Sequence, residues 1–154
     1  ILYSVTIFAL TFTTLTLIAG LGHETVGRRL SGYDLAMQAK PLIPKDAPLY
    51  SLGLLDHTVP FYLEKNSVMV NFQDELAFGI AQEPERWIPT LEEWLQVWQN
   101  PTPQHAFAIM SHALWRELQS QNIPMAVIAQ DELRVLVRKP LSEASQSTQK
   151  QGNP

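Results

Sequence analysis

The first 22 residues, ILYSVTIFALTFTTLTLIAGLG, carry no charged side chain. A helix of this length, rising about 1.5 Å per residue, can span a hydrocarbon core of about 30 Å. Its serine and threonine hydroxyls can bond to backbone carbonyls one turn earlier. The alternatives are a buried core helix or a signal peptide, which would have a basic start and a shorter apolar run. We expect residues 1–22 to be a transmembrane helix, the last one of a longer, polytopic parent protein.

The composition of the chain excludes several classes of function. The chain of 154 residues has a formal net charge of −4, which argues against general nucleic-acid binding. It has no cysteine, so disulfides and thiolate metal sites are excluded. Its four histidines are scattered without the spacing of a zinc site, and Gly-rich phosphate loops and a G-x-S-x-G elbow are absent. We expect no cofactor and no metal ligand in this part of the protein.

The chain divides into four parts by composition. Residues 23–48 are expected to be a juxtamembrane connector, which includes an amphipathic helix with Leu35, Ala36 and Ala39 on one side and ends in the proline-rich PLIPKDAP. Residues 49–140 alternate strand-like and helix-like patterns. Residues 141–154 are small and polar, and we expect them to be disordered.

The alternating region predicts an α/β fold. Strands are expected over residues 49–55, 67–72, 105–110, 125–130 and 133–139, and helices over residues 74–82, 90–100 and 111–121 and from near Thr58. Thr90 and Glu93 form a capping box, and Ser111 is a suitable N-cap. This order predicts a three-layer α/β/α sandwich with a mostly parallel sheet and an antiparallel edge, behind one transmembrane helix. The basic side chains of the last strand fit a solvated or edge-protecting face: Arg134, Arg138 and Lys139.

Two pairs of polar residues follow the first two strands. Asp56 and His57 come after the first, and Asp74 and Glu75 after the second. Ligands of open α/β sheets dock outside the carboxyl ends of the strands, so the four side chains could converge on one rim. The alternative is local: Asp56 and Asp74 would be helix N-caps, and Glu75 would lie in a first turn, where the helix dipole favours negative charge.

Aromatic and basic residues give a second set of candidates. Aromatic side chains of the domain are expected in the core rather than on a ligand platform: Phe61, Tyr62, Phe72 and Phe78. Tyr62 is kept as a substrate-binding or interdomain candidate. Basic side chains near the membrane are candidates for lipid-phosphate contacts, or simply interfacial anchors: Arg28, Arg29, Lys40 and Lys45.

A stretch of the domain resembles a known family. The segment from Ser51 to Trp98 is similar to the C-terminal region of bacterial ArnT-like glycosyltransferases, within the dolichyl-phosphate-mannose protein mannosyltransferase superfamily. The resemblance depends on Pro60-Phe61-Tyr62-Leu63, on Asp74-Glu75-Leu76 with Gly79, and on the Trp-containing helix before HAFAIM. It covers roughly residues 15–139.

The resemblance implies a part of a bacterial inner-membrane enzyme. Such enzymes have a bundle of transmembrane helices followed by a periplasmic α/β domain, and transfer a sugar from a polyprenyl-phosphate donor to an acceptor, which is lipid A for the aminoarabinose enzymes. Their catalytic acids, sometimes with a divalent metal, lie in loops of the bundle, so no catalytic residue is expected here. Arg28 and Arg29 after the apolar run would by themselves favour a cytoplasmic side, although earlier helices can determine the topology.

Three functions remain open at this stage. The first is a supporting periplasmic domain of a membrane glycosyltransferase, in contact with the bilayer and with the transmembrane bundle of the parent. The second is a single-pass, membrane-anchored domain that binds a periplasmic ligand or protein. The third is an independent enzyme that uses Asp56, His57, Asp74 and Glu75.

Overall fold

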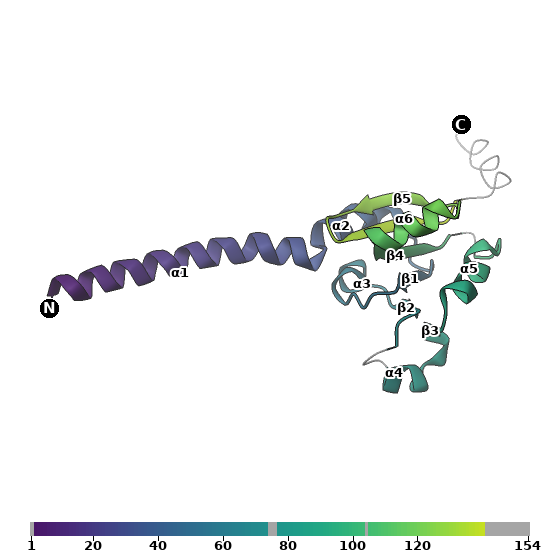
Figure 1. The fold of residues 1–154 in the computed structure, drawn as a ribbon, viewed down its shortest axis with the longest axis horizontal. Helices are drawn as coiled ribbons and strands as arrows, with labels where there is room; N and C mark the ends of the chain where they lie inside the picture. Colours follow the sequence, from purple (N-terminus) through teal and green to yellow (C-terminus); the bar gives the residue numbers. More distant parts are fainter. Residues whose placement is uncertain (1, 74–76, 104, 141–154) are drawn as a thin grey trace.

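The computed structural model describes residues 2–73, 77–103 and 105–140. Figure 1 shows a single long helix projecting from a domain that all the later elements form. In chain order the elements are α1 (Leu2–Ser31), α2 (Tyr33–Ala39), η1 (Lys40–Leu42), β1 (Leu49–Leu52), α3 (Thr58–Leu63), β2 (Ser67–Val70), α4 (Ala77–Gln82), η3 (Pro84–Arg86), β3 (Trp87–Ile88), α5 (Leu91–Gln99), β4 (Phe107–Ser111), α6 (His112–Ser120), β5 (Ala126–Gln130) and β6 (Arg134–Arg138).

Helix α1 contains the expected apolar span. The segment Tyr3–His23 is long and apolar enough to cross a membrane, with a mean hydropathy of 1.8, and none of it is buried against the domain. Four threonine hydroxyls donate to the carbonyl four residues earlier, at 2.8–2.9 Å: Thr11, Thr13, Thr14 and Thr16. These hydroxyls are therefore satisfied within the helix, as a lipid environment requires. The helix continues unbroken to Ser31, beyond the predicted end at residue 22.

The domain contains a mixed six-stranded sheet in the order β3-β2-β1-β4-β6-β5. Strand β1 pairs in parallel with β2 and β4, and β2 pairs in parallel with β3. Strand β6 pairs antiparallel with β4 and β5. The predicted parallel sheet with an antiparallel edge is confirmed. Strand β3 was not predicted, because two residues are too short to show a periodic pattern.

Helices cover both faces of this sheet. On one face α2 and α3 bury Leu35, Ala36 and Val59 against β1 and β4. On the other face α5 and α6 bury Trp94 and Trp98, among other residues, against the same sheet. This arrangement is the predicted three-layer α/β/α sandwich. The side chains of α2, which the sequence analysis assigned to the connector, belong to the core of the domain.

Local backbone chemistry determines where several elements begin and end. Strand β1 stops at Leu52, earlier than predicted, because Gly53 follows in a left-handed conformation with φ +61°. Thr90 Oγ1 accepts a hydrogen bond from the backbone N–H of Glu93 at 3.2 Å, and Ser111 Oγ accepts one from Leu114 at 3.3 Å. Both predicted N-caps are confirmed.

The prediction of a solvated face on the last strand was wrong. Strand β6 lies inside the sheet, between β4 and β5, and not at its edge. Arg134 is 5% exposed and Lys139 is 8% exposed, whereas Arg138 is half-buried. The Lys139 ammonium donates to the backbone carbonyls of Asn100 and Pro103, and burial lowers its pKa. Both buried cations are therefore held by protein oxygen atoms.

We predict that a substitution of Gly32, in the turn between α1 and α2, strongly lowers the stability of the domain. Gly32 has φ +62°, and a Cβ atom there would lie 2.6 Å from Arg134 and 2.7 Å from Val59. Gly53 has almost the same φ, but its nearest neighbour would be 3.8 Å away. We expect Gly53→Ala to lower the free energy of unfolding by about 1 kcal/mol through backbone strain alone. Gly32→Ala should cost at least about 1 kcal/mol more through overpacking.

Urea unfolding of the whole chain in detergent micelles, followed by tryptophan fluorescence, measures both variants. All four tryptophans lie in the domain, so the signal reports the domain and not α1. Equal losses for the two variants would contradict the close packing at Gly32.

Candidate functional site

The side chain of Arg134 joins three separate parts of the chain. Its guanidinium donates to the Asp56 carboxylate before α3 and to the backbone carbonyl of Leu30 near the end of α1. It also forms an ion pair with Asp131 at 3.3 Å. The side chains of Arg134 and Asp56 are only 6% and 8% exposed. We call Arg134, Asp56, Asp131 and the Leu30 carbonyl the junction cluster.

The β5–β6 hairpin positions Arg134. Asp131 opens the turn, and its Oδ1 accepts hydrogen bonds from the backbone N–H groups of Leu133 at 2.8 Å and Arg134 at 2.7 Å. This is the local bonding that favours aspartate in turns. The carbonyl of Asp131 lies 2.6 Å from Nε2 of His112, at the start of α6. The turn is thereby attached to the end of β4.

Asp56 has both carboxylate oxygens engaged. Its Oδ1 accepts from the backbone N–H groups of Thr58 and Val59, each at 2.9 Å, at the start of α3. Its Oδ2 faces Arg134. Asp56 thus accepts hydrogen bonds from the start of α3 as a capping side chain would, although the N-cap position itself is His57, and it forms an ion pair in addition. Its role toward a substrate or another domain stays a prediction, and a ligand there would have to compete with these bonds.

The remaining predicted polar candidates lie in two hollows. His57 is exposed and lines a hollow of about 320 Å³ together with Asp56, Lys65 and Arg86. Tyr62 lines a different hollow of about 500 Å³, at the end of α1. There its ring meets Tyr33 edge to face, with the ring centroids 5.1 Å apart. The structure thus brings Asp56 and His57 together and separates Tyr62 from them. Asp74 and Glu75 lie outside the described residues.

The basic candidates differ in how they are bound. Lys40 forms an ion pair with Glu64 at 2.6 Å, and its hydrogen bond and charge lower the pKa of Glu64. A lipid phosphate would therefore have to compete with Glu64 for Lys40. Lys45 is exposed. The side chains of Arg28 and Arg29 are outside the described part of the structure. All four lipid contacts stay predictions.

Within residues 2–73, 77–103 and 105–140, no group of three or more His, Cys, Asp or Glu side chains could hold a metal ion. We therefore assign no metal ligand in this part of the chain.

The sequence analysis missed the residues that form most of the junction cluster. Arg134 was assigned to a solvated or edge-protecting face of the last strand, and no role was predicted for Asp131. The spacing of Asp131 three residues before Arg134 is typical of an aspartate turn, so this local contact could have been predicted. The partner Asp56 is 78 residues away in the sequence, and no local pattern connects the two.

Comparison with known proteins identifies the family of this chain. Residues 35–139 match the family model described as the aminoarabinose transferase C-terminal domain. The chain belongs to this family. Two crystal structures of ArnT from Cupriavidus metallidurans, one bound to undecaprenyl phosphate and one in the apo state, are each 42% identical to it with a TM-score of 0.71. A comparison with curated proteins found no match.

The similarity to ArnT extends over most of this chain but over a small part of the ArnT chains. For the ArnT structure bound to undecaprenyl phosphate, the aligned region covers 79% of this chain and 22% of the ArnT chain. For the apo structure it covers 78% of this chain and 22% of the ArnT chain. The family resemblance stated from the sequence is confirmed, as is the α/β fold. The matched ArnT chains extend far beyond the aligned region.

Removing the cation of the junction cluster should destabilise the domain strongly. Arg134→Met leaves two carboxylates without their partner, one of them almost fully buried, and we expect a loss of about 3–5 kcal/mol in the free energy of unfolding. Arg138→Met, on the same strand but half-buried, should cost less than about 1 kcal/mol. Chemical denaturation of both variants in micelles measures this difference. A similar small loss for both would mean that the junction cluster contributes little to stability.

Two substitutions of Asp56 should separate its roles. Asp56→Asn keeps an oxygen that can accept from the N–H groups of α3, but removes the charge that faces Arg134. Asp56→Ala removes both. We expect both variants to be less stable than the original chain, and the alanine variant to be worse by about 1 kcal/mol, the usual value of an N-cap. Equal stabilities of the two variants would exclude a capping contribution.

Proposed function

We propose that the chain is the last transmembrane helix and the periplasmic α/β domain of a membrane glycosyltransferase of the bacterial inner membrane. The enzyme transfers a sugar from a polyprenyl-phosphate donor to lipid A or another periplasmic acceptor. Membership of the aminoarabinose transferase family carries this proposal. The ArnT structure with undecaprenyl phosphate supports the polyprenyl donor, because the compared region is 42% identical.

In this proposal the domain supports the reaction and does not carry its chemistry. Both carboxylate oxygens of Asp56 are occupied by backbone N–H groups and by Arg134, so this carboxylate is not poised to accept a proton from a substrate. His57 is exposed in a shallow hollow. The catalytic acids then belong to the membrane-embedded part of the enzyme, together with any divalent metal that it uses.

The supporting role is to hold a folded cap at a fixed position above the membrane. Helix α1 continues past its apolar span and is attached to the domain through the Leu30 carbonyl and Arg134. The domain therefore follows the orientation of the membrane helix. From this position it covers the periplasmic opening of the helix bundle and helps to position the donor or the acceptor.

Reconstituted enzyme tests this function. The ArnT-type transferase that contains this chain would be placed in proteoliposomes with undecaprenyl-phosphate-linked aminoarabinose and lipid A, and product would be measured by mass spectrometry. We expect transfer by the transferase, transfer that survives His57→Ala, and no transfer by the 154-residue chain alone. Sugar transfer by the chain alone, or loss of turnover in His57→Ala at unchanged stability, would assign catalysis to this domain and overturn the proposal.

A further inference from the structure

Two phenylalanines of the domain are unusually exposed. Phe61 on α3 is 74% exposed and Phe78 on α4 is 80% exposed, the highest values among the large apolar residues described outside α1. The prediction that both belong to the core was therefore wrong. Helix α4 buries none of its residues, although most of them are apolar. Exposed apolar surface of this kind, surrounded by polar groups, is typical of an interaction site.

Phe61 and helix α4 border one continuous surface. Phe61 lines the hollow that also contains His57 and Arg86. A second, mostly apolar hollow of about 320 Å³ lies between α4 and β2 and is lined by Met69 and Ile80, among other residues. Ser67 and Arg86 line both hollows, so the hollows adjoin. We call the surface from Phe61 across the two hollows to α4 the aromatic face.

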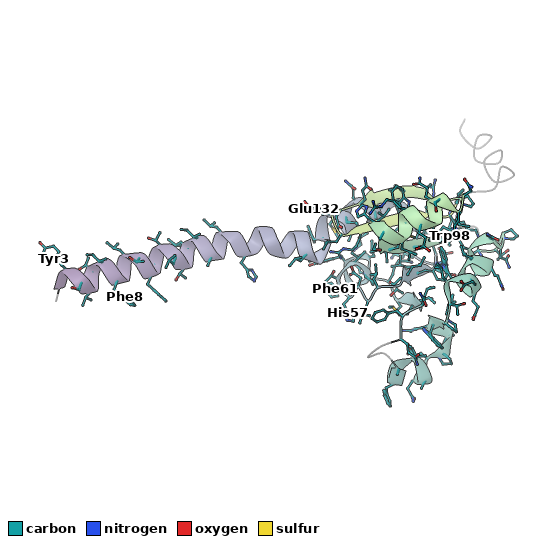
Figure 2. The ribbon with its side chains drawn as sticks, in the orientation of Figure 1. Tyr3, Phe8, His57, Phe61, Trp98 and Glu132 are labelled. Carbon is teal, nitrogen blue, oxygen red and sulfur yellow. The ribbon has the colours of Figure 1, made fainter. Side chains whose placement is uncertain are left out.

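One end of the aromatic face, at Phe61, lies on the side of the domain from which α1 extends. Figure 2 shows Phe61 and His57 at this side. Helix α1 continues from His23 to Ser31 beyond its apolar span, which adds about 12 Å. The headgroup layer on each side of a bilayer is only about 5–8 Å thick. Because the junction cluster attaches α1 to the domain, this end of the face is held above the lipid surface, where protein that protrudes from the membrane can reach it.

We propose that the aromatic face is the docking surface for the membrane-embedded body of the transferase, with Phe61 and Phe78 as its apolar anchors. This inference rests on the proposed function. About one fifth of the matched ArnT chain is aligned here, so the remainder of such a chain supplies the partner. The mixture of apolar hollow and charged groups, Lys65 and Arg86 among them, fits a protein surface better than a lipid surface.

Photo-crosslinking in native membranes tests the surface directly. Phe61 or Phe78 would be replaced by the photoreactive p-benzoylphenylalanine in the full transferase, and the adducts would be sequenced by mass spectrometry. We expect both positions to crosslink to periplasmic loops or helix ends of the membrane-embedded part. The same probe at Val97, which is exposed on α5 in the opposite helix layer, should give no such adduct. Adducts with lipid only, no adducts, or equal adducts from Val97 would overturn the proposal.

A functional measurement separates this proposal from the one on which it rests. The double variant Phe61→Ser with Phe78→Ser should lower sugar transfer about tenfold, with a melting temperature close to that of the original enzyme because both side chains are exposed. Val97→Ser should leave transfer unchanged. If the original enzyme transfers sugar and the double variant matches it, the docking surface is wrong and the proposed function stands. If the original enzyme transfers no sugar, the proposed function itself fails.

Discussion

The guanidinium of Arg134 is the point at which the apolar helix and the domain are joined. A buried arginine is costly unless its charge is paired, and here its partners are the Leu30 carbonyl at the end of α1, Asp56 before α3 and, through an ion pair, Asp131 in the β5–β6 turn. Gly32 allows this approach, because any Cβ atom at that position would meet the guanidinium. The same side chain therefore holds the end of α1 against the domain, and Figure 1 shows the direction in which α1 leaves it.

The attachment to α1 determines how the whole domain is oriented relative to that helix. The sandwich is stabilised in the usual way by apolar side chains on both faces of the sheet, with Trp94 and Trp98 on one side and the small side chains of α2 on the other. Burial alone would leave the domain free to swing on its helix. With the junction cluster in place, the aromatic face has a defined orientation relative to α1. The supporting role that we propose for this domain of the aminoarabinose transferase family requires such an orientation.

The features that depend on local pattern could be predicted from the sequence. The apolar span, the order of the long helices and strands, and the caps Thr90 and Ser111 follow from periodicity and short-range hydrogen bonding. Strand β3 is defined by its pairing with β2. Its two residues are too few to show a periodic sequence pattern. The burial of Arg134 depends on long-range pairing. Hydrophobicity alone could not distinguish an exposed Phe61 from a Phe61 in the core.

The central claim, that Arg134 holds the domain rigidly on its membrane helix, can be measured as a distance distribution. The chain has no cysteine, so Leu21→Cys on α1 and Val97→Cys on α5 introduce two unique sites for spin labels. The labelled chain would be measured in lipid nanodiscs. Double electron–electron resonance should give one narrow distribution, which broadens in Arg134→Met under conditions where circular dichroism shows the domain still folded. A broad distance distribution in the labelled chain that keeps Arg134 would contradict the account. An unchanged narrow distribution in the labelled Arg134→Met chain would also contradict it.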